Sequence, residues 1–370
     1  MRVAIVHYWL ITRRGGEKVV ESILKIFPEA DIYTLFLDGN KYGPHLPKQR
    51  IYTSCLNNPK IRRHYQKLFP LYPIGIKSLK LKDEYDLIIS SESGPAKGIS
   101  TPKGIPHICY IHSPMRYCWG FTDEYLRDMS KFLRPIARFF FERLRIWDLK
   151  TVENVTHYIA NSNNVAKRVK KYYNRESAVI YPPIESNLFK RPLMNNTERD
   201  IFLSFGAITP YKRIDLLVET FNQNKLNLVV IGNGSELEKL RQRANSNIKF
   251  LGSLEWGEIE RYLDRTRALL FPGEEDFGMI PLEVMSYGIP VLAYGQGGAL
   301  ETVIDNEQTS KSSGMFFDEQ SAESIQKCLE RFLVVENKYD KNWIRSHARK
   351  FEEDVFLEKF KKEVDLICNR

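Results

Sequence analysis

The 370-residue sequence lacks the features of several protein classes. No window holds the roughly 18 to 20 uninterrupted apolar residues that a membrane-spanning helix needs. The five cysteines are scattered and lack metal-ligand spacing, which favours reduced thiols over disulfides. The chain enters a strand pattern at residues 3–6 without the long apolar core of a signal peptide. These absences predict a cytoplasmic globular protein.

Charge is distributed unevenly. Residues 1–190 carry 31 Lys and Arg against 17 Asp and Glu, a net +14, whereas residues 191–370 carry 24 against 29, a net −5. A basic half should attract an anionic partner, although solvated surface charge is the plainer explanation. With no recognisable nucleic-acid module, a membrane surface or a phosphate-bearing lipid is favoured over nucleic acid. Basic residues mixed with aromatics at 131–150 fit a membrane interface, or else a core.

Strand-like apolar runs alternate with helical patterns along the chain. The expected strands are residues 3–6, 32–36, 86–90, 108–112, 158–160, 201–205, 228–231, 249–251, 268–271 and 291–293. This alternation predicts an α/β protein with two Rossmann-like, doubly wound domains. A Pro- and Asn-rich stretch at 181–197 is the expected linker, which gives domains at 1–190 and 191–342. An amphipathic helix is expected from 343 to 364.

Residues 272–283 carry the strongest motif, Pro-Gly-Glu-Glu-Asp-Phe-Gly-Met-Ile-Pro-Leu-Glu. A strand ends there, a loop follows, and a helix is expected to begin near Pro281, where its free N–H groups would bind an anion. Gly278 would let a diphosphate approach the main chain. Glu275 and Glu283 bracket this site and would accept hydrogen bonds from sugar hydroxyls, unless they are only surface charges.

This stretch resembles the Glu-x7-Glu motif of the family 4 (group 1) retaining glycosyltransferases, which have the GT-B fold. The resemblance covers most of residues 200–305 and several N-terminal blocks. It implies two facing Rossmann-like domains and a final helix, residues 343–370, that returns to the first domain. The second domain would bind a nucleotide-sugar and the first an acceptor. Glu275 would hold donor-sugar hydroxyls and Glu283 the ribose, and backbone amides would come from Phe277, Gly278, Met279 and Ile280.

A second motif lies at residues 205–215, where Lys212 and Arg213 open an expected helix. Two cations there would stabilise the charge of a departing diphosphate, although a solvent-exposed pair is the alternative. The resembled family has a lysine in this role at the Lys212 position. It often has an arginine where this chain has Ala207, and whether Arg213 replaces that arginine stays open.

The N-terminal half adds a glycine loop and a strand-end histidine. Gly15 and Gly16 precede the first helix and would expose backbone N–H groups to a ligand, or else only reverse the chain. His112 closes the strand at 108–112, where ligands of doubly wound sheets collect. The resemblance implies that His112 contacts the donor sugar. Arg116 is a weaker candidate for the acceptor or a phosphate, and His7 is expected to pack.

Two positions in the second half complete the expected donor site. Gly232 follows the strand at 228–231, and the backbone near Leu251 is expected to contact the nucleotide base. The chain contains no Asp-x-Asp triplet and no metal-ligand cluster of His, Cys and carboxylates. We therefore expect catalysis without a metal or other cofactor.

The predicted function is a retaining, metal-independent glycosyltransferase. It would move a hexose from a UDP-hexose such as UDP-glucose, slightly preferred, or from GDP-mannose, onto a surface-polysaccharide or lipid-linked glycan acceptor. Peripheral contact with the inner face of the membrane would come from the basic N-terminal domain, and nucleic acid is not an expected partner. An NAD-dependent oxidoreductase should show a Gly-x-Gly-x-x-Gly fingerprint, which is absent. A non-catalytic nucleotide-sugar-binding subunit is disfavoured by four intact candidate residues, Lys212, Glu275, Glu283 and His112.

Overall fold

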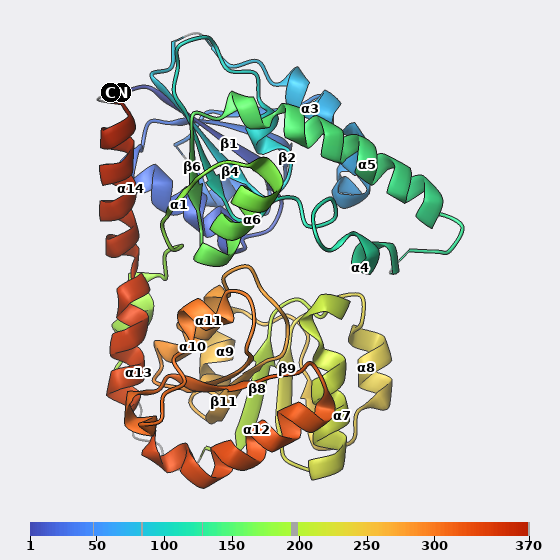
Figure 1. Ribbon diagram of the computed structural model, residues 1–370, viewed down its shortest axis with the longest axis vertical. Helices are drawn as coiled ribbons and strands as arrows, with labels where there is room; N and C mark the ends of the chain where they lie inside the picture. Colours follow the sequence, from blue (N-terminus) through green and yellow to red (C-terminus); the bar gives the residue numbers. More distant parts are fainter. Residues whose placement is uncertain (47, 83, 128, 194–198, 369–370) are drawn as a thin grey trace. The chain divides into compact units, whose positions relative to one another are not determined.

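The computed structural model describes residues 1–370 except 47, 83, 128, 194–198 and 369–370. The chain divides into two compact units, which we call unit 1 (residues 1–183 with 353–370) and unit 2 (residues 184–352). Each unit contains one sheet in which every observed strand pairing is parallel, as Figure 1 shows. This is the two-domain α/β architecture predicted from the sequence.

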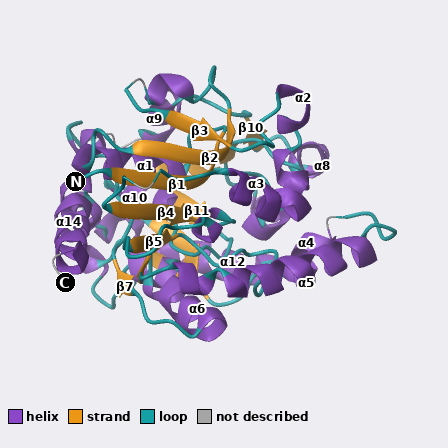
Figure 2. Cartoon of the chain, turned by 90° about the horizontal axis from the view of Figure 1, so that it is seen from above, coloured by secondary structure: helices purple, strands orange, loops and turns teal. Residues whose placement is uncertain are grey.

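The sheet of unit 1 has seven strands in the order β3-β2-β1-β4-β5-β6-β7. Figure 2 shows this order from β3 at one edge to β7 at the other. The strands are β1 (Val3–Leu10), β2 (Asp31–Leu37), β3 (Ile51–Thr53), β4 (Leu87–Glu92), β5 (His107–Ile111), β6 (His157–Ala160) and β7 (Ala178–Val179). The helices are α1 (Gly15–Ile26), α2 (Pro59–Arg62), α3 (Tyr72–Ser78), α4 (Thr122–Arg127), α5 (Arg134–Lys150), α6 (Asn163–Tyr173) and α14 (Glu353–Cys368).

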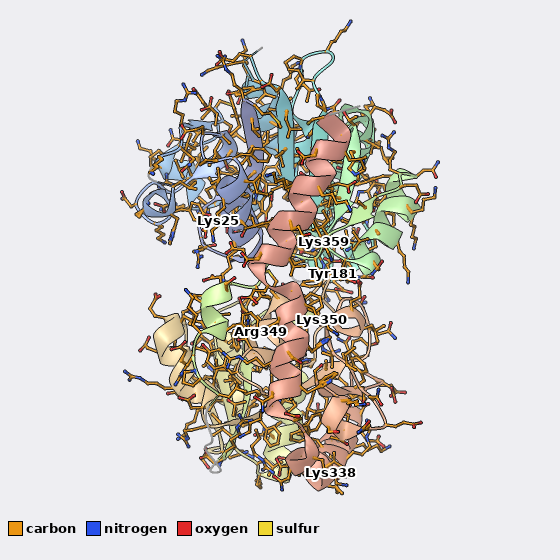
Figure 3. The ribbon with its side chains drawn as sticks, turned by 90° about the vertical axis from the view of Figure 1, so that its left-hand side faces the viewer. Lys25, Tyr181, Lys338, Arg349, Lys350 and Lys359 are labelled. Carbon is orange, nitrogen blue, oxygen red and sulfur yellow. The ribbon has the colours of Figure 1, made fainter. Side chains whose placement is uncertain are left out.

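Both faces of this sheet are covered, because alternate residues of a strand point to opposite sides. Val3 and Ile5 of β1 join a core with α1 and α14, whereas Ala4 and Val6 join a second core with α3. The Glu353 carboxylate at the start of α14 accepts a hydrogen bond from Ser22 of α1 at 2.7 Å. Figure 3 shows α14 with Lys25 of α1 nearby, and Lys25 also pairs with Glu353. The final helix therefore belongs to unit 1.

Unit 2 has a six-stranded sheet in the order β10-β9-β8-β11-β12-β13. Its strands are β8 (Ile201–Phe205), β9 (Leu228–Ile231), β10 (Ile248–Phe250), β11 (Thr266–Phe271), β12 (Val291–Tyr294) and β13 (Gly314–Phe317). Its helices are α7 (Ile214–Asn224), α8 (Leu237–Arg243), α9 (Trp256–Leu263), α10 (Met279–Met285), α11 (Ala299–Thr302), α12 (Ala322–Val335) and α13 (Lys341–Ala348). Because β8 and β11 lie at the centre, their carboxyl ends place the following loops side by side.

Two predicted boundaries differ from the structure. The first unit ends at residue 183 rather than 190, because Leu188 and Phe189 are buried in unit 2 and Arg345 donates to the Phe189 carbonyl at 2.6 Å. The expected single helix from 343 to 364 is instead two helices, α13 and α14, and the return to unit 1 begins at Glu353 rather than 343. The break is held by a backbone hydrogen bond from Ile184 to the Phe351 carbonyl at 2.9 Å. Part of the predicted linker, residues 194–197, lies outside the described residues.

Candidate active site

The carboxyl ends of β8, β9 and β11 surround a small pocket in unit 2. Its walls come from the segments that follow these strands, with Ala207, Ile231 and Gly273 among the lining residues, and from the Lys212 side chain. Ligands of open parallel sheets bind at the carboxyl ends of the strands. They bind where neighbouring strands connect to opposite sides of the sheet, which here is between β8 and β11. The pocket therefore lies where the sequence placed the nucleotide-sugar.

Lys212 and Glu275 form an ion pair beside this pocket. Lys212 ends the 3₁₀ turn Pro210–Lys212 that follows β8, and Glu275 lies in the loop after β11. Only about one-sixth of each side chain is exposed, at 15% and 17%. The two loops touch because residue 273 is glycine: a Cβ there would lie 2.9 Å from the Lys212 Cα. The structure thus brings together the two residues on which the sequence interpretation most depended.

Arg213 is placed differently from its neighbour. It has a left-handed backbone, with φ of 54°, and its guanidinium binds both carboxylate oxygens of Asp215 at 3.1 Å. It does not line the pocket, whereas Ala207 and Lys212 do. Lys212 is therefore the cation that faces the pocket, and the position that often holds arginine in the resembled family contributes no charge here.

Glycines allow the loops around the pocket to approach closely. A Cβ on Gly232 would lie 1.8 Å from the Gly206 carbonyl oxygen, and Gly232 has a φ of +140° that other residues rarely adopt. A Cβ on Gly206 would meet the Ile280 side chain at 3.1 Å. The backbone N–H of Leu251 donates to the Val230 carbonyl at 3.0 Å, which ties the end of β10 to β9. Gly232 and Ile280 therefore both lie next to Gly206, in the loop after β8. Leu251 lies at the end of β10, the strand beside β9.

The segment that carries both predicted glutamates leads into α10. This helix begins at Met279, two residues before the predicted start, and Gly278 precedes it with a left-handed φ of 86°. Phe277 is buried, and Glu283 on α10 is 7% exposed. The structure thus has a helix start after Gly278, in a helix about two turns long, and its role toward a diphosphate stays a prediction.

Two glycines that hold this segment were not predicted. The N–H of Gly298 donates to the Glu275 carbonyl at 2.8 Å, and a Cβ on Gly298 would lie 2.3 Å from the Phe277 Cα. Gly297 approaches the Glu275 carbonyl in the same way. The run Gly295-Gln296-Gly297-Gly298 directly after β12 is the sequence signal that could have found them.

In unit 1, Gly16 and His112 lie close together. α1 begins at Gly15, and a Cβ on Gly16 would lie 2.9 Å from the Tyr8 hydroxyl and 3.6 Å from His112 Nε2. His112 follows β5, and its Nε2 lies 2.8 Å from the Ser91 hydroxyl. Its main-chain N–H donates to the Glu92 carbonyl at 2.7 Å. The glycine loop and the histidine therefore form one local site at the carboxyl ends of β1, β4 and β5.

His7 lies beside Gly16, where a Cβ would approach its ring to 3.5 Å, and Arg116 contacts Phe121 instead. The Arg116 guanidinium stacks on the Phe121 ring at 4.0 Å from the centroid. His7 is fully buried, and burial lowers its pKa to about 3, so the ring stays neutral at physiological pH. The prediction that His7 packs rather than reacts agrees with this placement.

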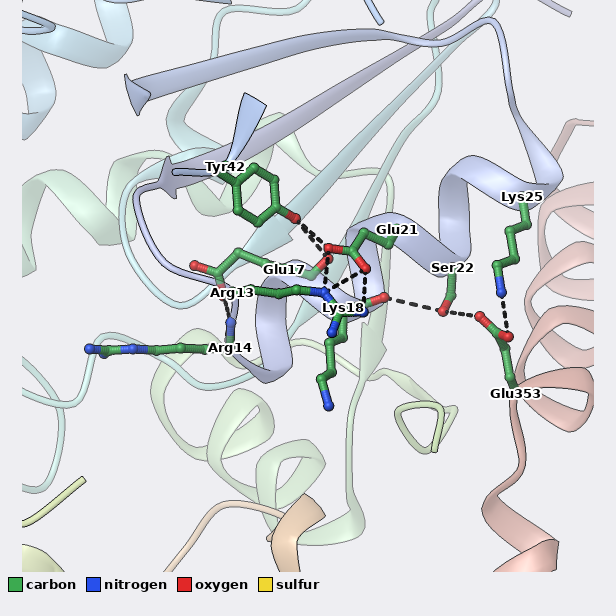
Figure 4. A network of polar contacts seen from close by, with 9 residues as sticks. All are labelled: Arg13, Arg14, Glu17, Lys18, Glu21, Ser22, Lys25, Tyr42 and Glu353. Atoms are coloured by element: carbon green, nitrogen blue, oxygen red, sulfur yellow. Dashed lines mark hydrogen bonds and ion pairs between the residues drawn. The ribbon is translucent and has the colours of Figure 1, made fainter. Parts of the chain in front are cut away.

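A polar network fixes the segment before α1, as Figure 4 shows. The Glu21 carboxylate accepts hydrogen bonds from Arg13, at 2.8 Å, and from the Tyr42 hydroxyl, at 2.9 Å. The main-chain N–H of Arg14 donates to the Glu17 carboxylate at 3.2 Å. Burial raises the pKa of Glu17 to about 7, so this group titrates near physiological pH. Hydrogen bonds to Glu21 and Glu17 thus hold Arg13 and Arg14, the two residues directly before Gly15.

A buried ionic cluster lies beneath His112 and was not predicted. Lys97 and Asp148 form an ion pair in which both side chains are completely buried. Asp148 also accepts hydrogen bonds from Trp119 Nε1 at 2.7 Å and from the Tyr173 hydroxyl at 2.8 Å. Glu92 accepts from the Lys97 main-chain N–H at 2.9 Å, and burial raises the pKa of Glu92 to about 8. The residues are far apart in sequence, so no local pattern announces the cluster.

Comparison with known families shows which family the chain belongs to. A model of the family described as glycosyl transferases group 1 matches residues 185–350. A model described as glycosyltransferase family 4 matches residues 13–188. The chain belongs to the family 4 (group 1) glycosyltransferases. This family membership does not favour the oxidoreductase alternative.

Relatives of this glycosyltransferase include named sugar transferases. It is 27% identical over 281 residues to an alpha-1,3/1,6-mannosyltransferase, ALG2 of Kluyveromyces lactis. The aligned region covers 61% of this chain and 54% of the relative. It is 25% identical over 305 residues to an uncharacterised glycosyltransferase of Methanocaldococcus jannaschii, which covers 77% and 76%. The chain thus spans only about half the length of the mannosyltransferases that it matches.

Solved structures show the fold of this glycosyltransferase. The Anabaena protein Alr3699/HepE in complex with UDP has a TM-score of 0.71 at 14% identity, covering 99% of this chain and 100% of that one. Sucrose-phosphate synthase from Thermosynechococcus elongatus has a TM-score of 0.70 at 17% identity, covering 99% of each chain. These likenesses show the GT-B fold predicted from the sequence.

Proposed function

We propose that the chain transfers a hexose, with retention of anomeric configuration, from a nucleotide-sugar bound in unit 2 to a glycan acceptor bound in unit 1. The observation that carries this proposal is the Lys212–Glu275 ion pair beside the pocket at the strand ends. It supplies one cation for a diphosphate and one carboxylate for sugar hydroxyls, from two loops that only glycine allows to touch.

Lys212 is the group that stabilises the leaving diphosphate. When the donor binds, its phosphates compete with Glu275 for the ammonium group, and the carboxylate is released to accept hydrogen bonds from the sugar. As the glycosidic bond breaks, negative charge grows on the diphosphate, and a fixed cation lowers the barrier most where charge develops. Backbone N–H groups at the start of α10, near Gly278 and Met279, would share this charge.

The other predicted residues receive supporting roles. Glu283 would hold the ribose, and the strand end at Leu251 would contact the base. In unit 1, His112 would orient the sugar or the acceptor hydroxyl, held by Ser91 at 2.8 Å. Among the described residues, no three His, Cys, Asp or Glu side chains come together in a group that could hold a metal. We propose that Lys212 performs the neutralising role without a metal ion.

GDP-mannose is the donor that we propose first. Several relatives found by sequence are named as mannosyltransferases, and this favours GDP-mannose over the UDP-glucose that motif reasoning slightly preferred. The Anabaena protein solved with UDP-glucose, at 16% identity, keeps UDP-glucose as the second candidate. A surface polysaccharide or a lipid-linked glycan is the acceptor class that we propose.

Thermal shift against GDP-mannose, UDP-glucose, GDP and UDP tests the donor. We expect GDP-mannose and GDP to raise the midpoint of unfolding, since a ligand that binds only the folded chain stabilises it. Slow release of mannose from GDP-mannose without acceptor, followed by NMR, would show the anomer formed first. If only UDP-glucose and UDP stabilised the chain, UDP-glucose rather than GDP-mannose would be the donor. Release of the inverted anomer would contradict retention.

A further inference from the structure

Helix α5 carries several large apolar side chains that are largely exposed to solvent. Phe132, two residues before the helix, is 90% exposed, and Ile136, Phe139 and Ile146 are each at least half exposed. We call these residues with Phe140 the α5 apolar face. α5 and α4 project from the sheet of unit 1 in both Figure 1 and Figure 2. A contiguous exposed apolar surface of this kind marks an interaction site.

The exposed apolar side chains are not the core stripe of the helix. Ala137, Phe141 and Leu144 are buried and form the stripe that packs on unit 1. Residues 136, 139 and 146 recur at intervals of three and seven, which places them along one side of the helix, and Phe132 lies in the turn before its start. The helix therefore has two apolar stripes, of which only one is needed for folding.

Cations lie among these apolar residues. Between residues 131 and 150 the chain has six Lys and Arg against Glu142 and Asp148, and Asp148 is buried with Lys97. Arg143 and Lys150 follow Ile136 by seven and fourteen residues, so they share its side of the helix. The Arg143 guanidinium lies 5.1 Å from the Phe139 ring centroid. Apolar insertion and positive charge are thus presented on one face.

The adjoining elements extend the same chemistry. The 3₁₀ segment Tyr65–Leu71 packs on α5 through Phe69 and Phe141, whose ring centroids are 4.9 Å apart. Leu71 at its end is 38% exposed, and Ile74 of α3 is 58% exposed. The apolar surface therefore continues from α5 toward basic segments that include Lys67 and Lys77.

We propose that the α5 apolar face binds the surface of a bilayer that contains anionic phospholipid. Large apolar side chains mixed with Arg and Lys are what an interfacial helix needs, because the former enter the headgroup boundary and the latter meet lipid phosphates. A two-fold contact between copies of this chain would instead bring identical cations together. No helix of the described residues has the length and apolarity to cross a bilayer, so the proposed contact is peripheral.

Sedimentation with vesicles tests this proposal. The probe is the full chain with vesicles of phosphatidylcholine alone or of equal parts phosphatidylcholine and phosphatidylglycerol. We expect the chain to pellet with the anionic vesicles, and less so at high salt, since salt screens charge. The triple variant Phe132→Ser/Ile136→Ser/Phe139→Ser should partition about tenfold less or weaker still. Lys131→Gln/Arg143→Gln/Lys150→Gln should lose about fivefold per charge removed.

Matched controls separate this face from general surface hydrophobicity. Leu300→Ser/Val334→Ser/Leu366→Ser removes three side chains that are 53%, 80% and 49% exposed elsewhere. This control should pellet like the unchanged chain, and all variants should keep the same melting midpoint and donor hydrolysis. Equal pelleting of the two serine variants would overturn the proposal. A second outcome would also overturn it: the unchanged chain fails to pellet with vesicles but forms dimers, and those dimers dissociate in the Phe132→Ser/Ile136→Ser/Phe139→Ser variant.

Discussion

Lys212 and Arg213 are adjacent cations with different surroundings. Lys212 is 15% exposed and paired with Glu275 across two loops, whereas Arg213 is paired with Asp215 only two residues away. The Arg213 guanidinium is already paired with a carboxylate in its own turn, so leaving that partner for a ligand would gain little free energy. A partly exposed ion pair of this kind also contributes little to stability. The two residues therefore offer a comparison in which charge is removed from neighbouring positions with unequal expected consequences.

Lys212→Gln should lower the transfer rate by about two orders of magnitude, the cost of removing one group that stabilises developing charge. Arg213→Gln should change the rate by about twofold or less, because its guanidinium does not face the pocket. Steady-state transfer from the preferred donor measures both. Equal losses in the two variants would show that Lys212 has no special position.

Glu92 is a residue whose protonation couples pH to stability. Its folded-state pKa of about 8, raised chiefly by burial, lies above the ordinary value near 4.5. The folded chain therefore holds a proton that the unfolded chain releases between these values. The associated stability is fully present below pH 4.5 and is lost as the pH rises through about 8.

Glu92→Gln should weaken this loss, because an amide stays neutral and can still accept from the Lys97 N–H. Between pH 5 and pH 9 the free energy of unfolding should fall in both proteins. We expect the fall to be smaller in the variant than in the unchanged chain, by a few kcal/mol. Urea unfolding at the two pH values measures the difference. Glu17→Gln is the comparison. The stability linked to the Glu17 proton is lost as the pH rises through its pKa of about 7, which is lower than that of Glu92. Parallel pH profiles for Glu92→Gln and the unchanged chain would contradict the assignment.

At the scale of elements, the pocket depends on glycines that let loops meet. Gly232→Ala would place a Cβ 1.8 Å from the Gly206 carbonyl at a φ of +140°, which no small shift relieves. We expect unit 2 to lose about 3 kcal/mol or more. The control is Gly257→Ala in α9, where a Cβ meets nothing within 4 Å and helix propensity predicts a gain of up to about 1 kcal/mol. Thermal or urea unfolding that ranks the two variants equally would contradict this origin of the pocket.

Elements defined by local pattern could be predicted from the sequence. β8 and β9 have the predicted bounds, because short, largely apolar runs flanked by polar or glycine residues specify buried strands. The break between α13 and α14 could not be predicted, because it depends on a bond between Ile184 and Phe351, distant in sequence. β3 and β7, three and two residues long, are too short to show a periodicity in the sequence.

The candidate site shows the same division. Lys212, Glu275 and the Gly278 turn follow from a motif, and the structure brings the first two together. Whether adjacent Arg213 joins them depends on a left-handed backbone and on Asp215, which the residue types alone leave open. The Lys97–Asp148 pair joins residues 51 positions apart, so only the fold reveals it.

For the whole molecule, the division of charge parallels the proposed division of labour. The basic first half contains the glycine loop, His112 and the α5 apolar face, and the acidic second half contains the proposed donor pocket. A basic unit beside an anionic bilayer would concentrate the enzyme where lipid-linked acceptors are found. Donor chemistry and membrane binding are thereby assigned to different units and can be tested apart.

Chelation tests the proposed absence of a metal requirement. Because Lys212 is proposed to neutralise the leaving diphosphate, transfer by the full chain should proceed at the same rate with and without EDTA. Added Mg²⁺ or Mn²⁺ should not accelerate it beyond the effect of ionic strength. A rate that falls with EDTA and returns with a divalent ion would contradict the proposed role.

The most direct measurement compares nucleotide binding and sugar transfer in Glu275→Ala, with Glu238→Ala, an exposed carboxylate of α8, as the matched control. If Glu275 holds donor-sugar hydroxyls, calorimetry should show GDP or UDP bound within about threefold of the unchanged affinity, under about 1 kcal/mol. Transfer should be abolished in Glu275→Ala and unchanged in Glu238→Ala. Loss of nucleotide binding together with transfer, or transfer that survives the substitution, would contradict the assignment of this carboxylate to the sugar.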